Sequence, residues 1–112
     1  MEAEERQFLL TTAWFFARHG QFARARNLCA ALVEENPRDG VPAAALAAFQ
    51  LEAAEPEAAL DTLSAARFPK TLERAEALLE TRSLLALGRT AAARRRWQRY
   101  LDSTKGRTRT WA

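Results

Sequence analysis

The chain has 112 residues and a formal net charge of +3, which suits one domain with a single hydrophobic core. Glycine and proline occur only four times each, and the abundance of alanine, leucine, arginine and glutamate favours an all-α fold. A single cysteine excludes an internal disulfide, and with a single histidine it offers too few ligands for a metal site. We therefore expect neither a metal nor another cofactor.

Hydrophobic periodicity and turn residues predict six helices in chain order. They are expected at about 3–18, 22–35, 41–53, 56–66, 72–87 and 91–103. The first of them has apolar residues nearly all round, so it must be covered from two directions. Residues 104–112 are expected to form a flexible basic tail, which leaves 1–103 as a single domain.

The same turn signal returns at a regular interval along the chain. Small residues stand in register at the turns (Gly20, Ala54, Gly88) and again five positions later (Ala25, Ala59, Ala93). The first set lets the chain reverse, and the second lets two helices approach closely. The interval matches the period of the tetratricopeptide (TPR) repeat. We expect an all-α, tetratricopeptide-like right-handed stack of about three helical hairpins, with units at about 6–39, 40–71 and 72–103. The alternative is an ordinary helical bundle with a chance repeat.

Positive charge is concentrated near the C-terminus. Residues 1–87 carry a net charge of −4, whereas residues 88–112 carry +7. Such a segment is either the polar outer face that ends a helical stack or a surface for nucleic acid or an acidic protein. The spacing of Trp97, Tyr100 and Leu101 with Ala93 is typical of a core stripe. We therefore favour the end of a stack, and nucleic acid is not the expected partner.

No catalytic constellation is apparent, and the chain is not expected to be an enzyme. His19 lies at a predicted turn, and no glycine-rich loop could hold a phosphate. Cys29 lies on an apolar stripe and is interpreted as a core residue, with a reactive thiol as the alternative. The acidic N-terminus does not resemble a signal peptide, and the longest apolar runs are too short to span a membrane. We therefore expect a cytoplasmic protein.

Binding is the function that remains. In a TPR stack, the first helix of each hairpin lines the concave side. On this register the expected partner-binding residues are Leu10, Trp14, Ala17, Val41, Ala44, Ala48, Leu51, Leu78, Arg82 and Leu85. A groove of mostly apolar and small side chains suits an amphipathic helix of a partner protein. The alternative is that a terminal segment of this chain or a second copy fills the groove.

Two stretches of the chain carry a family resemblance. They comprise Arg6–Leu10, Trp14, Gly20, Ala23–Ala25, Leu28, Leu32 and Asn36-Pro37, then Ala93-Arg94, Trp97-Gln98 and Tyr100-Leu101. In these stretches, about half of the chain, it resembles the YscY-type chaperones of bacterial type III secretion systems. The resemblance implies a cytoplasmic chaperone that binds a secreted partner of the X type, keeps it soluble in a hetero-oligomer and presents it to the export gate.

Three other interpretations stay open. The TPR-built chaperones of the needle subunit in the same systems are similar in design. A nucleic-acid-binding adaptor would use the basic C-terminal segment. A generic TPR scaffold would use the groove to join two other proteins.

Overall fold

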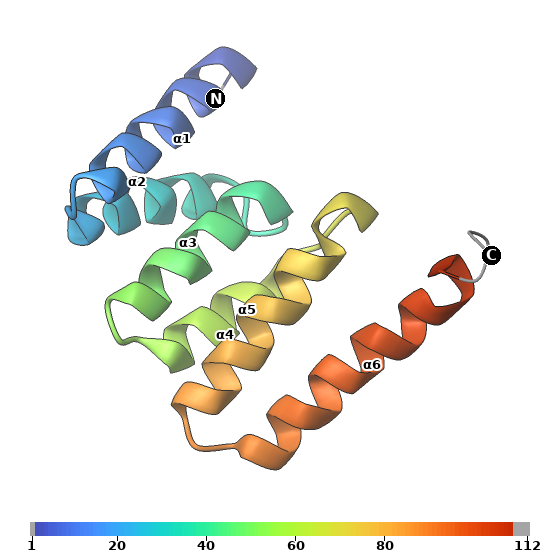
Figure 1. Ribbon diagram of the computed structural model, residues 1–112. Helices are drawn as coiled ribbons and strands as arrows, with labels where there is room; N and C mark the ends of the chain where they lie inside the picture. Colours follow the sequence, from blue (N-terminus) through green and yellow to red (C-terminus); the bar gives the residue numbers. More distant parts are fainter. Residues whose placement is uncertain (1, 109–112) are drawn as a thin grey trace.

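The structure is a computed structural model that describes residues 2–108, with side chains described up to residue 105. These residues form six α-helices, one short 3-10 helix and a single isolated β-bridge (Figure 1). The elements are α1 (Ala3–Arg18), α2 (Phe22–Glu35), α3 (Gly40–Glu52), α4 (Pro56–Ala65), η1 (Lys70–Leu72), α5 (Glu73–Ala86) and α6 (Thr90–Thr108). The all-α class predicted from the sequence is therefore confirmed. None of the helices in the described part is long and apolar enough to cross a membrane.

The helices are arranged as three consecutive hairpins, α1/α2, α3/α4 and α5/α6 (Figure 1). Each helix packs against the next one in the chain, and α3 also contacts α5. The described part measures 41 × 33 × 25 Å along its principal axes. Because contacts run mainly between neighbours in sequence, each helix keeps at least one side that no other helix covers.

The three hairpin turns are evenly spaced along the chain and share one backbone geometry. The described residues with positive φ are Gly20, Ala54 and Gly88, at 75°, 60° and 76°. In each turn the amide of the next residue donates a hydrogen bond to the carbonyl five positions earlier, from Gln21 to Phe16 (2.8 Å), Glu55 to Gln50 (2.8 Å) and Arg89 to Leu84 (2.9 Å). These bonds satisfy carbonyls that the helix end would otherwise leave unpaired. The prediction that the three small residues mark equivalent turns is confirmed.

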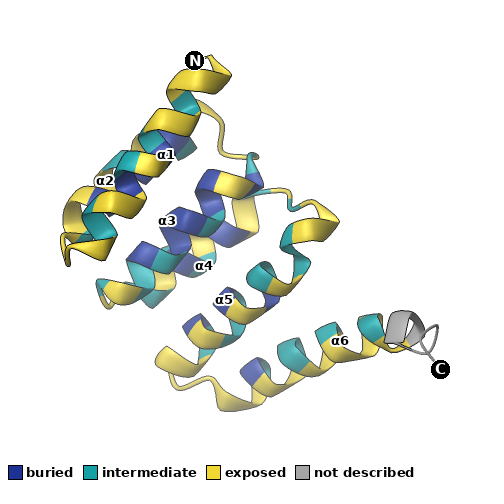
Figure 2. Cartoon of the chain, turned by 45° about the horizontal axis from the view of Figure 1, so that its top comes forward, coloured by how far each residue is buried: buried dark blue, intermediate teal, exposed yellow. Residues whose placement is uncertain are grey.

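The core consists of two clusters that meet at α3. One joins α1, α2 and α3 through Leu10, Ala13, Ala25, Cys29, Leu32, Ala45, Leu46 and Phe49. The other joins α3, α4 and α5 through Ala47, Ala59, Leu63 and Leu79. Figure 2 shows α3 as the most deeply buried helix, in line with the seven buried residues along it. α3 is therefore the central support for everything that lies on its exposed side.

The start of α3 is held by several polar contacts. Asp39 accepts a hydrogen bond from the Val41 amide (3.2 Å) and forms an ion pair with Arg6 of α1 (2.7 Å). A Cβ at Gly40 would lie only 2.7 Å from the carbonyl oxygen of Arg67, so this close approach requires glycine. These contacts tie α1 and the segment after α4 to one end of α3.

The last helix is attached to α5 by polar contacts. Arg96 forms an ion pair with Glu80, and the Ser103 hydroxyl donates to Glu73 (3.1 Å). Burial, together with the nearby Glu80 carboxylate, raises the pKa of Glu76 on the same surface of α5. Helix α5 thus presents acidic side chains to the basic α6, which favours their association.

The predicted end of α6 is wrong. The sequence places it near residue 103, with a tail over 104–112, but the helix continues to Thr108. Asp102 accepts a hydrogen bond from Gln98 (3.0 Å) and forms an ion pair with Lys105 (3.2 Å). Both interactions hold the pKa of Asp102 below its usual range. These contacts stabilise the last turns of the helix. Residues 109–112 of the predicted tail lie outside the described residues.

The turn geometry predicts the effect of a substitution at Ala54. Its φ of 60° is costly for a residue with a Cβ, and glycine occupies both equivalent positions. We expect Ala54→Gly to raise the free energy of unfolding by about 0.5–1 kcal/mol, after the entropic cost of glycine is counted. Denaturant unfolding followed by circular dichroism measures this. Ala53→Gly, at a residue with φ of −85°, is the control and should lower stability. Equal effects of the two changes would contradict the strain at Ala54.

Candidate binding groove

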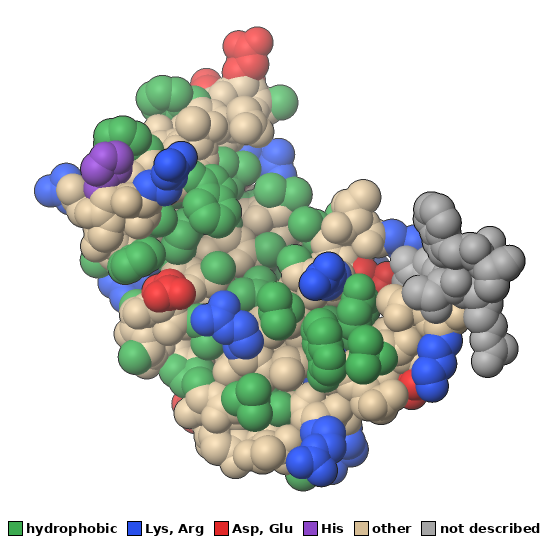
Figure 3. Space-filling model, viewed as in Figure 1, with side chains coloured by type: hydrophobic (Ala, Val, Ile, Leu, Met, Phe, Trp, Pro, Cys, Tyr) green, Lys and Arg blue, Asp and Glu red, His purple; other side chains and the backbone are tan. Residues whose placement is uncertain are grey.

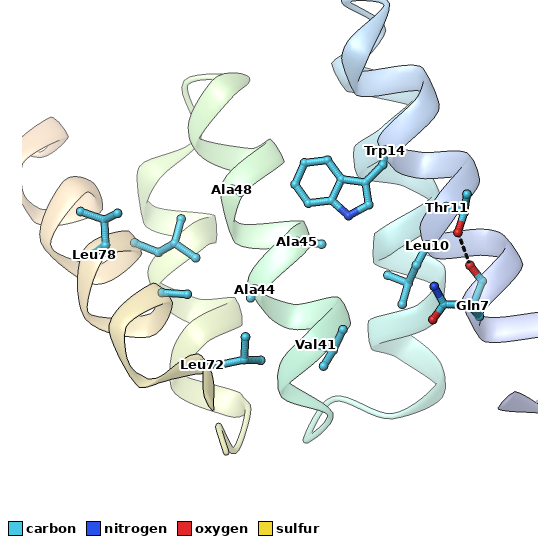
Figure 4. Close-up of a pocket in the computed structure, with 12 residues that line it drawn as sticks. Gln7, Leu10, Thr11, Trp14, Val41, Ala44, Ala45, Ala48, Leu72 and Leu78 are labelled. Atoms are coloured by element: carbon cyan, nitrogen blue, oxygen red, sulfur yellow. Dashed lines mark hydrogen bonds between the residues drawn. The ribbon is translucent and has the colours of Figure 1, made fainter. Parts of the chain in front are cut away.

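An apolar groove of about 460 Å³ lies between α1, α3 and α5 (Figure 4). It is lined by Gln7, Leu10, Thr11, Trp14, Val41, Ala44, Ala45, Ala48, Leu72, Ala75, Leu78 and Leu79. The three main helices that line it are the first helices of the three hairpins. We call this depression the groove.

Small residues form the floor of the groove and large ones form its walls. Ala44, Ala45 and Ala48 follow one another along α3, so the backbone of this helix lies close to the open space. Trp14 rises from α1 on one side and Leu78 from α5 on the other (Figure 4). An incoming side chain can therefore reach the backbone of α3 between two apolar walls.

The position of Trp14 is set by the core below it. Its ring packs edge-on against Phe49, with 5.4 Å between ring centroids and an interplanar angle of 70°. Phe49 is buried in the cluster between α1, α2 and α3, so it supplies a fixed surface. Trp14 nevertheless remains 53% exposed, and Val41 and Leu78 are each 43% exposed. The groove therefore presents large apolar side chains to solvent.

The groove continues past Trp14 and Ala48 into a second depression of about 240 Å³, which we call the charged end. Trp14 and Ala48 line both depressions. The other residues of the charged end are Ala17, Arg18, Phe22, Phe49, Glu52 and Arg82. Figure 3 shows hydrophobic side chains collected on this face with Lys and Arg side chains beside them. A ligand in the groove would thus meet apolar walls along its length and charged groups at one end.

Most of the residues predicted from the sequence come together here. Leu10, Trp14, Val41, Ala44, Ala48 and Leu78 line the groove, and Ala17 and Arg82 line the charged end. Leu10 is only 6% exposed, so it supports the groove from below and offers little surface to a ligand.

Two of the predicted residues lie elsewhere. Leu51 is half-buried against the cluster of α3, α4 and α5. Leu85 is exposed and lines a separate depression of about 300 Å³ between α5 and α6, together with Trp97. Both residues occupy the last turn of their helix, Leu51 in α3 and Leu85 in α5.

Some lining residues were not predicted, among them Thr11, Ala45, Leu72 and Leu79. Thr11 lies one helical turn from Gln7 and shares a side of α1 with it, and that spacing is a signal that was available in the sequence. Its hydroxyl donates to the Gln7 carbonyl (2.9 Å), so it brings no unpaired donor to the groove (Figure 4). Leu72 belongs to η1, a turn that periodicity cannot separate from the start of α5.

None of the residues that line the groove carries a titratable side chain. No group of three or more His, Cys, Asp or Glu side chains that could hold a metal occurs among the described residues. His19 lies at the end of α1, where Nδ1 is 2.8 Å from the Phe15 carbonyl oxygen. Cys29 is fully buried between α1, α2 and α3, as the sequence predicted, and burial raises its pKa to about 11. The arrangement suits binding of an apolar surface.

Comparison with protein-family models and with curated proteins finds no match for this chain. Its function therefore has to be inferred from the groove and from the sequence. The relevant features are exposed apolar walls, a floor of small residues and a charged end.

Substitutions of Leu51 and Leu78 should separate the core from the groove. Leu51→Glu places a charge against the core, and we expect it to lower the free energy of unfolding by about 2–3 kcal/mol. Leu78 is exposed, and a glutamate there would lie one helical turn before Arg82, where the two charges attract. We therefore expect Leu78→Glu to change the free energy of unfolding by no more than about 0.5 kcal/mol. Urea unfolding of both variants measures the difference. Similar losses would mean that Leu78 also supports the fold.

The burial of Cys29 predicts a nearly inert thiol. A thiol with a pKa of about 11 carries well under about 1% thiolate at pH 8, and the side chain is inaccessible as well. We expect Ellman's reagent to react with the folded protein at the rate of its unfolding and to react quickly in denaturant. Fast reaction under native conditions would place Cys29 at an accessible site.

Proposed function

We propose that the protein is a cytoplasmic chaperone that binds an amphipathic helix of a secreted protein in the groove. The partner would be an X-type component of a type III secretion system, held soluble in a hetero-oligomer and then presented to the export gate. The single observation that carries the binding function is the apolar groove with its exposed walls.

The shape of the groove favours a helix as the ligand. An amphipathic helix projects apolar anchors at positions i, i+3, i+4 and i+7, which together form a stripe. The alanine floor lets such a helix approach the backbone of α3, while Trp14 and Leu78 contact the anchors from both sides. Each of these side chains is about half exposed, so burial against a partner contributes roughly 1 kcal/mol per residue.

The exposed apolar side chains in the walls of the groove also favour the presence of a bound partner. Soluble monomers rarely leave large contiguous apolar patches open to water. Trp14, Val41 and Leu78 form such a patch across three helices. A partner that itself carries an aggregation-prone apolar stripe would cover this patch and be protected by it, which is the action of a chaperone.

The architecture that we propose is a TPR-like right-handed stack of three hairpins. Three equivalent turns at equal intervals, at Gly20, Ala54 and Gly88, support it. Further support comes from Ala25, Ala59 and Ala93, which are all buried five positions after the turns. The family resemblance at the two ends of the chain supports the assignment to type III secretion.

Two substitutions on the walls test the function. We expect Val41→Glu combined with Leu78→Glu to weaken the complex with a co-expressed X-type partner at least tenfold, because both place a carboxylate against the apolar stripe of that partner. The measurement is the amount of partner that co-purifies, with circular dichroism to check that the variant is folded. Arg95→Glu is the matched control, since Arg95 is exposed on α6, and it should leave the complex intact.

Salt separates groove binding from binding of phosphates. A complex held by apolar contacts should persist between about 0.1 and 0.5 M NaCl, whereas several phosphate contacts would weaken by orders of magnitude over that range.

An intact complex of the variant that combines Val41→Glu and Leu78→Glu would exclude the groove as the site. Binding of other amphipathic helices without any binding of the X-type partner would overturn the assignment to secretion and leave the groove function standing.

A further inference from the structure

Helix α1 carries a second apolar surface on a different side from the groove. Phe8 and Phe15 are 69% and 59% exposed, and Thr12 lies between them on the same side. Glu4 and His19 lie at the two ends of this row, at helical spacing. We call these five residues the outer face of α1. Figure 3 shows His19, in purple, beside hydrophobic side chains at the edge of the molecule.

The equivalent side of α3 is covered by another helix. The spacing between the turns at Gly20 and Ala54 relates each position on α1 to an equivalent position on α3. The positions equivalent to Phe8, Thr12 and Phe15 are Pro42, Leu46 and Phe49. All three are buried, and Leu46 and Phe49 are only 5% and 3% exposed. They are covered because α2 packs against α3, which brings Cys29 and Leu32 to the same cluster.

On α1, none of the described helices occupies the place that α2 takes on α3. An i, i+7 pair of exposed phenylalanines is a surface on which another helix can pack. The outer face of α1 is therefore a helix-packing surface without its helix.

We propose that the missing helix is α1 of a second copy of this chain, packed antiparallel across a twofold axis. When Phe8 is set against Phe15 of the second copy, the charged residues also match. Near that register, Glu4 lies on the same flank of the interface as Arg18 of the second copy, so the two side chains can pair at each end. The acidic side chains begin the helix and the basic ones end it, so antiparallel pairing brings opposite charges together at both ends.

The centre of this register is also suited to close contact. Thr11 and Thr12 lie at the twofold axis, midway between the phenylalanines. Each hydroxyl already donates to a carbonyl of its own helix, Thr11 to Gln7 (2.9 Å) and Thr12 to Phe8 (2.8 Å). Packing of the two helices therefore buries no unpaired hydroxyl, which would otherwise be costly.

The charge pattern favours α1 of the second copy over its other helices. The basic α6 would also attract the acidic start of α1, but such a contact joins different surfaces and gives either a ring or an open chain of copies. The α1 pairing joins identical surfaces and closes as a dimer. It rests on one helix from each copy, so the interface is small and the dimer should dissociate at about micromolar concentrations. The wall of the groove at Trp14 stays exposed, because Trp14 lies on another side of α1, while Thr11 and Arg18 lie at the border between the two surfaces.

Removal of the phenylalanines tests the surface. We expect the purified full chain to form dimers in sedimentation velocity as its concentration rises from about 1 to 100 µM. Phe8→Ser combined with Phe15→Ser should weaken the dimer at least tenfold with unchanged circular dichroism, because neither side chain belongs to the core. Leu101→Ser on α6 is the control and should leave the dimer unchanged. Loss of self-association in this control would indicate head-to-tail packing and overturn the proposal.

A charge exchange tests the register. Glu4→Arg alone and Arg18→Glu alone should each weaken the dimer, because each places like charges on the same flank at both ends of the interface. The two changes together should restore it, since the pairs are re-formed with reversed signs. Leu78→Glu should leave the dimer unchanged, since it alters only the groove. A monomer over the whole concentration range, or single variants that the double variant fails to rescue, would overturn the proposal.

Discussion

The close approach of helices at small residues is the interaction on which the structure depends. Ala25, Ala59 and Ala93 are buried where the second helix of each hairpin begins to pack, five positions after a turn of fixed geometry. Larger side chains there would push the helices apart. The same arrangement has a consequence for the surface. A row of helices joined mainly to their sequence neighbours covers only part of each helix, so apolar side chains on the remaining sides stay in contact with water.

The contrast between α1 and α3 shows how position in the row decides whether a residue is buried. Phe15 and Phe49 occupy equivalent places in the first and second hairpins, and both are phenylalanine. Phe49 is buried by α2 and supports Trp14, whereas Phe15 lies open beside His19, with ring centroids 4.4 Å apart. The difference comes from the neighbouring helix alone. Burial in a row of hairpins is therefore a property of the interface between units as well as of the sequence of each unit.

The sequence predicts the fold better than it predicts the edges of the site. Helix periodicity and small turn residues indicated the six helices, and the apolar side of α1 indicated the wall at Trp14. Two things depended on packing that no local pattern records. The last turns of α6 contain contacts among Gln98, Asp102 and Lys105, and Leu51 packs against the cluster of α3, α4 and α5 although its register resembles that of the groove residues. Position along a repeat indicates the side of a helix, but the twist between hairpins decides where the groove begins and ends.

The composition of α1 becomes understandable when its sides are considered one by one. Leu10 and Ala13 pack into the core against α2 and α3, and Trp14 forms a wall of the groove. Phe8 and Phe15 remain on a third side, next to charged residues that match those at the other end of the helix. A helix on the surface of a small domain needs only one apolar side. Three apolar sides on one helix are consistent with three neighbours: the core of its own chain, a partner helix in the groove and a second copy of α1. Because the three sides diverge around the helix axis, a dimer of this kind would leave the walls at Trp14 exposed in both copies, with Thr11 and Arg18 at the border between the dimer surface and each groove.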